Sequence, residues 1–316
     1  MRIPRSASAL SAAVLTAAVL APAPAHAAVT RIENTVQIRC AFTTQNQSSD
    51  WYFPAGTPKA LVWLQHGFVR ANDHVADLAT EYAEHGYLVF APSLPSASIF
   101  GCTLQNIGNN TDYLDNVADL FGKAADPADK LGRSFSDAKA RAGRSGLALP
   151  SAMVFAGHSA GGEAVPYVAN RLRTAYPQAF ARLRGLVLFD PVKSFVGDNL
   201  GGALDGLKTT SLPIQAVSAP HGTCNNSGSG TSALQDRLDR PFLGVRLTTG
   251  AHTDAEGAST DGVGTLACGT PKAPNIAILQ TLATNWSDGY LTGSPDPAYY
   301  PGGAYYDGLA DIETLS

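Results

Sequence analysis

The sequence predicts an α/β protein with a mostly parallel central sheet and helices on both faces of that sheet. Short, near-continuous apolar runs recur along the chain, and such runs are typical of strands that are buried on both faces. Segments with apolar residues at helical spacing separate most of these runs. Strands that alternate with helices favour a parallel sheet, because each helix returns the chain to the same end of the sheet.

The composition fits a well-packed globular protein. The chain has 316 residues, of which 45% are hydrophobic, and this is enough to bury a substantial core in one domain or at most two. With 31 Gly, 20 Pro and only 15% charged residues, the chain is expected to be rich in loops rather than disordered. It contains no internal repeat and no linker long enough to divide it. We therefore expect residues 28–316 to form a single domain.

The first 27 residues have the pattern of a secretory signal peptide. A basic segment, residues 1–5, precedes an apolar segment, residues 9–21, and Ala25-His26-Ala27 is a small-x-small cleavage site. The apolar segment is too short, and too interrupted by Ser, Thr and Pro, to span a membrane. We expect cleavage after Ala27 and a soluble, secreted, extracellular protein without a membrane span.

The charge of the chain argues against nucleic acid as a partner. The formal net charge is −4, and removal of Arg2 and Arg5 with the signal peptide would bring it to −6. A mildly acidic protein without a basic stripe lacks the electrostatic footprint that binds a phosphate backbone.

The N-terminal third is expected to form four strands and one helix. The first strand shows alternating apolar and polar side chains, and Pro54 ends the short second one. The third is an apolar run that leads into His66-Gly67-Phe68, and the helix after it has one apolar face and a capping Gly86. These elements are strands over 29–43, 51–54, 60–65 and 87–91 and a helix over 72–85.

The rest of the chain continues the alternation. Residues 92–150 form the longest stretch between clear strands, with a loop rich in Gly and Asn around Cys102, and we expect this stretch to cover the sheet. An aromatic, turn-rich tail follows the closing helix. The expected strands are the run that ends at Gly157, then 185–191, 213–218 and, as the last strand, 242–248, and the expected helices cover 111–124, 134–142, 162–176 and 273–286.

The stretch 151–163 has the pattern of a nucleophile elbow, a sharp turn that presents a serine between a strand and a helix. An apolar run ends in Gly157-His158-Ser159-Ala160-Gly161, and a helical pattern follows. A serine hydroxyl is a weak nucleophile at neutral pH and must be held beside a base. Gly157 and Gly161 leave space where a side chain would collide with a neighbouring element. We predict Ser159 as the nucleophile, with a tight turn around an idle serine as the alternative.

Four polar residues directly follow predicted strands: His66, Ser159, Asp190 and His252. The carboxyl ends of parallel strands meet at one edge of a sheet, and ligand sites of such sheets form at this edge. We therefore expect all four residues to lie along the same edge of the molecule.

His252 is the predicted base. It follows the last expected strand in a Gly-Ala-His-Thr-Asp turn, from which its ring can reach the elbow. The order Ser159, Asp190, His252 is the chain order that such elbow sites use. A solvated loop histidine is the alternative for His252. His221, after the penultimate strand, is the main rival base, and the less well placed histidines are His66, His74, His85 and His158.

Asp190 is the predicted acid that orients the base. It ends a buried strand 31 residues after Ser159, where a fixed carboxylate is available. The commonest acid position, after the penultimate strand, carries residues 219–226 and no carboxylate. Asp198 and Asp205 stay open as alternatives, and a turn-capping role is the non-catalytic explanation of Asp190. Two further acidic residues are too close to His252 in sequence to orient it easily, namely Asp254 and Glu256.

Two backbone N–H groups are needed to hold the oxygen of a tetrahedral intermediate. One is expected from Ala160, directly after the nucleophile, and the other from Phe68 in the loop after the third strand. The Phe68 ring is also a candidate for the substrate pocket, together with His158 and His221. Trp63 is expected in the core.

An even number of cysteines in an exported chain favours disulfides. Of the three pairings that Cys40, Cys102, Cys224 and Cys268 allow, we favour Cys40–Cys102 and Cys224–Cys268, because the partners are near neighbours in sequence. No Cys-x-x-Cys motif and no cluster of Cys and His indicates a metal site, and we expect no cofactor.

On these residues the chain resembles the α/β-hydrolases over nearly all of its expected mature length. It is similar to the chlorophyllase-type hydrolases, whose elbow is Gly-His-Ser-x-Gly-Gly and whose acid lies in an Asp-Pro-Val step, as in residues 157–162 and 190–192 here. It also looks like the secreted actinobacterial lipases and cutinase-type polyester hydrolases, through its export signal and its His-Gly-aromatic loop. It departs from this second branch at Ala160, where Met is usual, and has no acid after the penultimate strand.

The resemblance and the candidate triad imply a secreted carboxylic ester hydrolase, an esterase or lipase, that acts as a monomer through an acyl-enzyme. Polyester depolymerisation is the alternative with the same chemistry. About twenty residues separate Asp190 from the next expected strand, too few for a large cap domain, so an open site for lipid, short-chain or polymeric esters is expected. A hypothesis of another class is a non-catalytic exported binding protein with the aromatic tail, 299–306, as its interface.

Overall fold

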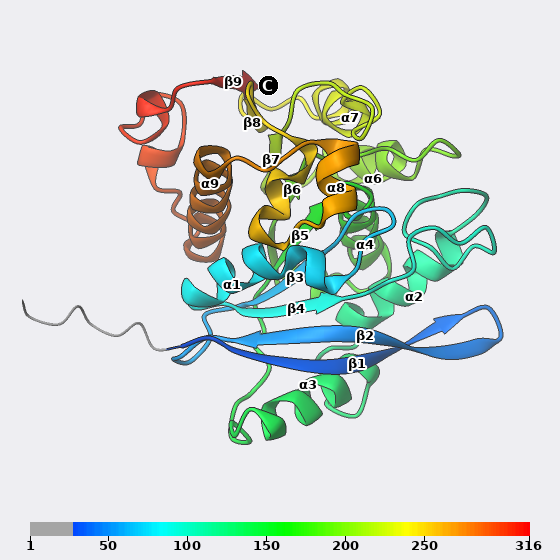
Figure 1. The fold of residues 1–316 in the computed structure, drawn as a ribbon. Coiled ribbons are helices and arrows are strands. Elements are labelled where there is room, and N and C mark those ends of the chain that lie inside the picture. The colour runs from blue at the N-terminus through cyan, green and yellow to red at the C-terminus, as the bar shows by residue number, and fades with distance from the viewer. Residues whose placement is uncertain (1–27) are drawn as a thin grey trace, which may run out of the picture.

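The computed structural model describes residues 28–316, and the expected signal peptide lies outside the described residues. The described chain is built on a nine-stranded sheet in the order β1-β2-β4-β3-β5-β6-β7-β8-β9 (Figure 1). The six strands from β4 to β8 in this order run parallel, and the β1–β2 hairpin and β9 pair antiparallel at the two edges. The predicted α/β class with a mostly parallel sheet is confirmed. The strands are β1 (Thr30–Cys40), β2 (Thr43–Phe53), β3 (Leu61–Gln65), β4 (Leu88–Pro92), β5 (Met153–His158), β6 (Leu183–Phe189), β7 (Ile214–Ser218), β8 (Gly244–Leu247) and β9 (Ile312–Leu315).

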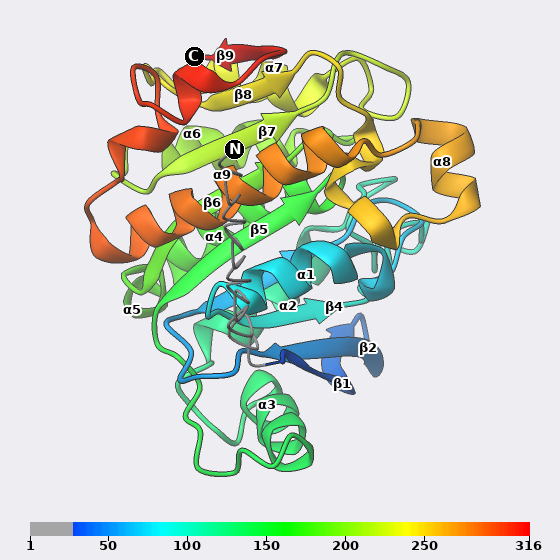
Figure 2. The same cartoon turned by 60° about the vertical axis from the view of Figure 1, so that its left-hand side comes forward.

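Helices cover both faces of the sheet (Figure 2). Side chains of α1 and α9 form a hydrophobic core with one face, and side chains of α2, α3, α4 and α6 form a second core with the other face. The α-helices are α1 (Ala76–Glu84), α2 (Thr111–Gly122), α3 (Lys130–Arg141), α4 (Gly161–Ala175), α5 (Pro177–Phe180), α6 (Asn199–Leu207), α7 (Ser229–Arg237), α8 (Gly262–Cys268) and α9 (Ala273–Thr292). The 3-10 helices are η1 (Asn72–Val75), η2 (His252–Ala255), η3 (Gly257–Ser259), η4 (Pro297–Tyr299) and η5 (Tyr306–Gly308).

The central strands contribute to both cores, which explains their continuous apolar sequences. Successive side chains of a strand point to opposite faces of the sheet. In β3, Leu61 and Trp63 belong to the core on the α4 side, whereas Val62 and Leu64 belong to the core on the α9 side. Trp63 is fully buried, as expected, and its ring lies 4.8 Å from that of Phe121 in α2. Both faces of the central strands are therefore sealed from water, and polar side chains can function at the ends of these strands.

The sheet extends further at both edges than the sequence predicts. β2 begins at Thr43 and not at Trp51, because the polar segment before Trp51 pairs with β1 along its whole length. The outer part of this hairpin has partly solvent-exposed faces, so its sequence lacks the apolar signal of a buried strand. Residues 242–248 do not form the last strand, since Ile312–Leu315 adds β9 along β8. Of the four residues of β9 only Leu315 is buried, which explains why its pattern is weak.

Besides α5 and α6, two further helices of the C-terminal half, α7 and α8, were absent from the sequence prediction. Both are short, and both begin in segments rich in Gly and Ser or Thr, which favour turns over helices. Asp261 caps α8, since its side chain accepts a hydrogen bond from the Gly264 N–H. α8 lies at the same edge of the sheet as the elbow and becomes part of the site described below.

Two disulfides join loops across the molecule, and they are the pairs favoured by sequence proximity. Cys40–Cys102 ties the end of β1 to the loop after β4, with Cα atoms 5.7 Å apart. Cys224–Cys268 ties the loop after β7 to the end of α8, with Cα atoms 5.6 Å apart. No free cysteine is present among residues 28–316.

Removal of the first disulfide is expected to lower the free energy of unfolding substantially. Cys40 and Cys102 are separated by 62 residues, and the loss of such a cross-link releases about 4 kcal/mol of loop-closure entropy in the unfolded chain. The variant Cys40→Ala/Cys102→Ala should therefore unfold at a clearly lower urea concentration than the wild type. Phe42→Ala, at a fully exposed side chain in the same turn, is the matched control and should change stability by less than about 0.5 kcal/mol. Equal urea midpoints for the double variant and the control would contradict the prediction.

Candidate active site

Ser159 and His252 lie in the wall of one open cavity of about 450 Å³ at the carboxyl edge of the parallel strands. Ser159 follows β5, and His252 opens the 3-10 helix after β8. The loop after β3 supplies Gly67 and Phe68, and α8 contributes Val263. Of the four strand-end residues that the sequence suggested, Ser159 and His252 line the cavity, whereas His66 and Asp190 are buried and do not line it.

The elbow has the strained, closely packed geometry that its glycines predict. Ser159 has a φ of 57°, in the left-handed region, which is unusual for a residue with a side chain. A Cβ atom on Gly157 would lie 2.4 Å from the Gly161 carbonyl oxygen, and one on Gly161 would lie 2.5 Å from the Gln65 carbonyl oxygen. The prediction that both positions require glycine is confirmed. Glycine is also required at Gly67, where a Cβ would lie 2.8 Å from the Ser159 Cβ.

Asp190 and His252 form a short polar contact at the site. The His252 Nδ1–H donates to Asp190 Oδ2 at 2.6 Å, and both side chains are about nine-tenths buried or more. Asp190 also has a left-handed backbone, with a φ of 40°, directly after β6. The backbone N–H of Ala219, at the end of β7, donates to Asp190 Oδ1 at 3.1 Å. This arrangement fixes the tautomer of His252 and leaves its Nε2 available to act as a base.

Ser159 and His252 line the same cavity but do not contact each other through a hydrogen bond. Within residues 28–316, no hydrogen bond joins the Ser159 hydroxyl to the His252 ring. Contacts between nucleophile and base are often long in the absence of substrate and shorten when substrate binds. The geometry is therefore that of a serine and a histidine facing one reaction space, with the histidine already fixed by Asp190.

The backbone N–H groups of Phe68 and Ala160 both lack an acceptor within the described chain. Ala160 is fully buried at the start of α4, where the helix dipole favours negative charge. Phe68 follows Gly67, which is packed against Ser159. Two unpaired N–H groups on either side of the nucleophile are the donors that a developing oxyanion requires. The Phe68 ring is 45% exposed and lines the cavity, as its proposed place in the substrate pocket requires.

His158 contacts the candidate base, a connection that sequence reasoning missed. Its Nε2–H donates to the backbone carbonyl oxygen of His252 at 2.9 Å, so its Nδ1 carries no proton. Burial, and then the nearby His252 ring, lower the pKa of His158 to about 4, which keeps the ring neutral. His158 lines the cavity and also holds the backbone of His252 in place. The position of His158 next to Ser159 in the sequence does not indicate its hydrogen bond to the His252 carbonyl oxygen.

The structure does not support His221 as a substrate-binding residue or as the base. It does not line the cavity; its ring packs beside Gly228 and accepts a hydrogen bond from Arg246 at 3.3 Å. Asp198 and Asp205 are likewise unsuited to orient His252, because both pair with cations, among them the shared Arg237, in partly exposed positions. These alternatives to His252 and Asp190 lie on surface loops and helices rather than against the base.

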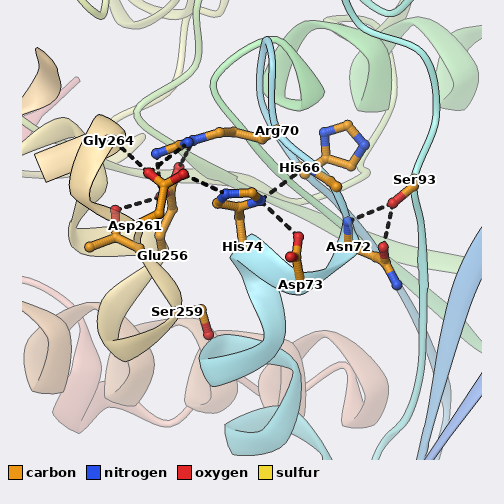
Figure 3. Close-up of polar contacts among 12 residues, drawn as sticks. His66, Arg70, Asn72, Asp73, His74, Ser93, Glu256, Ser259, Asp261 and Gly264 are labelled. Atoms are coloured by element: carbon orange, nitrogen blue, oxygen red, sulfur yellow. Dashed lines mark hydrogen bonds and ion pairs between the residues drawn. The ribbon is translucent and has the colours of Figure 1, made fainter.

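A charged network ties the segment after His252 to the loop after β3 (Figure 3). Arg70 donates to both carboxylate oxygens of Glu256, at 2.9 and 3.1 Å, and to Asp261 at 3.0 Å. His74 in η1 lies 3.4 Å from the second oxygen of Asp261. Arg70 and Glu256 are 186 residues apart, so no local pattern predicts their pairing. The network fixes η2 and α8, and with them His252, relative to the proposed oxyanion donors.

A second buried carboxylate, Glu163, holds two loops of the cavity wall. It accepts hydrogen bonds from the N–H and the hydroxyl of Ser194, and the Ser194 hydroxyl oxygen accepts one from the Asn106 N–H. Neighbouring residues of these two loops, including Ile107 and Phe195, line the cavity. Burial raises the pKa of Glu163 to about 7, and the hydrogen bonds from Ser194 oppose this shift.

Comparison of the sequence with protein-family models and with curated proteins gives no match. The assignment of function therefore depends on the residues of the site. Residues 28–316 include no helix that is both long enough and apolar enough to cross a bilayer. In the same residues no three His, Cys, Asp or Glu side chains are grouped as metal ligands.

The variant Glu163→Gln is expected to change how stability depends on pH. In the unfolded chain this carboxyl group loses its proton near its ordinary pKa of 4.5, but in the folded protein only near 7. Between these values the folded state binds more protons, so wild-type stability falls as the pH rises, by about 3 kcal/mol in total. The glutamine side chain of the variant cannot ionise, so urea unfolding should show its stability rising relative to wild type by about 3 kcal/mol between about pH 4.5 and pH 8.

The control for this prediction is Glu84→Gln, at an exposed position of α1. Its stability relative to wild type should stay nearly constant over the same pH range. Lys193 favours ionisation of Glu163 and Asp198 opposes it, and neither is altered in either variant. A flat difference for Glu163→Gln would show that the carboxyl group is not held protonated by its surroundings.

Proposed function

We propose that this protein is a secreted serine hydrolase that cleaves carboxylic esters, with the α/β-hydrolase fold. The observation that carries the proposal is the buried Asp190–His252 hydrogen bond of 2.6 Å beside Ser159 on a left-handed elbow. The free N–H groups of Phe68 and Ala160 add the donors that acyl transfer needs. Two disulfides within residues 28–316 agree with an oxidising, extracellular destination.

In the first half-reaction, the Ser159 hydroxyl oxygen attacks the ester carbonyl carbon while His252 Nε2 takes the hydroxyl proton. The carbonyl oxygen becomes an oxyanion and accepts hydrogen bonds from the Phe68 and Ala160 N–H groups. Collapse of the tetrahedral intermediate breaks the bond to the alcohol oxygen. His252 returns its proton to that oxygen, the alcohol leaves, and the acyl group stays on Ser159.

In the second half-reaction, water takes the place of the alcohol. His252 Nε2 removes a proton from the water as its oxygen attacks the acyl carbon, and the same two N–H groups hold the new oxyanion. The bond to Ser159 then breaks, and His252 returns the proton to the serine oxygen. The Asp190 carboxylate stabilises the imidazolium that forms in each half-reaction.

The cavity wall favours a substrate with an apolar acyl part. Five of the ten exposed large hydrophobic side chains in the described chain line this cavity, which concentrates apolar surface at the site. Only the nine-residue helix α6 lies between β6 and β7, so no large cap covers the elbow at this point. The five side chains are Phe68, Val69, Ile107, Phe195 and Val263.

Polyester hydrolysis is the second candidate function. Phe195 is 81% exposed and Val263 is 72% exposed, so the apolar wall continues onto the outer surface. Such a wall suits a chain that is too long to be enclosed, whether an acyl chain or a polymer. A non-catalytic binding role is the hypothesis of another class, and the experiment below separates it from hydrolysis.

Hydrolysis of p-nitrophenyl esters from acetate to palmitate by residues 28–316 tests the proposal. Ser159→Ala and Asp190→Asn are each expected to lower kcat by a factor on the order of 1,000 or more, because the first removes the nucleophile and the second disturbs the base. Asp205→Asn, on the surface, is the matched control for Asp190→Asn and should keep the wild-type rate. A fluorophosphonate probe should label the wild type but not Ser159→Ala.

Full activity of Asp190→Asn would remove Asp190 from the triad. A wild-type protein that is inert toward every ester and unlabelled by the probe would favour the binding role instead. Release of monomer from a polyester film, together with weak activity on soluble esters, would favour the polyester function over an esterase or lipase.

A further inference from the structure

The loop between β7 and α7 has the most unusual backbone of the described chain. Asn226, Ser227 and Gly228 follow one another with φ values of 48°, 55° and 72°, all in the left-handed region. Such conformations are disfavoured for residues with side chains, and they persist where surrounding contacts enforce them. The loop occupies the position after the penultimate parallel strand, where the sequence offers no carboxylate.

The side chain of Asn225, directly before this run, is 2% exposed and uses all of its hydrogen-bonding groups. Its Oδ1 accepts from the N–H groups of Gly222 and Gly228, at 2.8 and 2.9 Å. Its Nδ2 donates to the Pro220 carbonyl oxygen at 2.8 Å and to the carboxylate of Asp190. Donors on one side and acceptors on the other leave only one orientation of the amide.

The contact with Asp190 involves both carboxylate oxygens. Asn225 Nδ2 lies 3.2 Å from Oδ1 and 3.1 Å from Oδ2. Oδ1 also accepts from the Ala219 N–H, and Oδ2 also accepts from His252 Nδ1. The carboxylate is thus surrounded by donors, and rotation about its bond to Cβ would break at least two of these hydrogen bonds.

We propose that Asn225 is a positioning residue for the triad, whose amide fixes the rotation of the Asp190 carboxylate and thereby the ring of His252. The proposal rests on the ester-hydrolase function proposed above. The strained loop is the means by which an amide from the end of β7 reaches a carboxylate at the end of β6. The disulfide partner Cys224 and the cavity residue Asn226 flank Asn225, so the loop is anchored on both sides.

A purely structural role, in which Asn225 only holds its own loop, makes different predictions. The variant Asn225→Ala tests the proposal through the separation of kcat and KM on a p-nitrophenyl ester. Misplacement of a catalytic group by about 1 Å costs on the order of 100-fold in rate. We expect kcat to fall by about 10- to 100-fold with KM within about twofold of wild type, because the amide touches the acid and not the cavity.

Tyr290→Phe is the matched control for lost stability. Its hydroxyl donates a buried hydrogen bond to Gln215, near the start of β7 and at the opposite edge of the sheet from the site. Thermal unfolding should show that both variants are less stable than wild type, whereas only Asn225→Ala should lose kcat. Equal kcat values for Asn225→Ala and Tyr290→Phe would overturn the proposal.

Asn225→Asp keeps the size of the side chain and gives a second test if the alanine variant fails to fold. It places a second carboxylate about 3 Å from Asp190, and like charges this close cannot both ionise easily. While the two carboxyl groups share one proton, a hydrogen bond between them can persist. At higher pH both are ionised, and the repulsion between the two carboxylates should displace Asp190. The titratable groups that face the new carboxyl group are Asp190 and, beyond it, His252; His221 lies near Gly228.

The variant should therefore lose kcat as the pH rises through a range in which the wild type keeps a constant rate. A pH profile of Asn225→Asp that is parallel to the wild-type profile would also overturn the proposal. If Ser159→Ala leaves hydrolysis unchanged, the proposed function itself fails. If Ser159→Ala abolishes hydrolysis while both Asn225 variants behave as wild type, only the role of Asn225 fails.

Discussion

Buried carboxyl groups hold the loops of this site together, because a polar group without access to water must find hydrogen-bond partners in its surroundings. The strand ends at the carboxyl edge lead into irregular loops, which cannot satisfy their backbone groups by regular pairing. In each case a carboxyl group that is at most 4% exposed accepts hydrogen bonds from a residue of another segment. The carboxylates and their donors are Asp190 with Ala219, Asn225 and His252; Glu163 with Ser194; Asp254 with Ala251, Lys272 and Asn275; and Glu256 with Arg70 and Thr260.

The position of the proposed base follows from three of these groups together. Asp190 binds the ring of His252, Asp254 accepts the N–H of Ala251 directly before it, and Glu256 anchors the segment after it to Arg70. The carbonyl oxygen of His252 is held by His158. A short 3-10 helix, η2, would be a weak support for a catalytic group by itself. With its ring, its carbonyl and both flanking segments bound, His252 has little freedom to move away from the cavity.

The sequence predicted those parts of the structure that depend on local pattern or on close packing. The central strands are apolar throughout because both of their faces are buried, and Gly157 and Gly161 reveal the elbow because no other residue fits there. The edge strand β9 and the short helix α8 escaped prediction, since β9 buries only Leu315 and α8 buries only Gly264. Burial supplies most of the signal that a sequence pattern carries, and these elements bury little.

Contacts between distant loops escaped prediction for a different reason. Arg70 and Glu256 are far apart in the chain, and the reach of Asn225 to Asp190 depends on a backbone conformation that residues other than glycine rarely adopt. Neither contact follows from residue type or spacing. Sequence order named Ser159, Asp190 and His252 as candidates, but the residues that hold the acid and the base in place emerged only from the three-dimensional arrangement.

The position of the proposed acid shows which constraint the proposed chemistry imposes on the fold. The carboxylate must meet His252 Nδ1, but the strand that carries it is free to vary, because neighbouring parallel strands are only about 4.8 Å apart. Asp190 follows β6, and its left-handed backbone and the hydrogen bond from Ala219 bring its carboxylate to the end of β7. The segment after β7, which carries no acid, supplies the amide of Asn225 instead. Under the proposed roles, the loop after β7 therefore supplies donors to a carboxylate on the neighbouring strand end, and it does so with three successive left-handed residues.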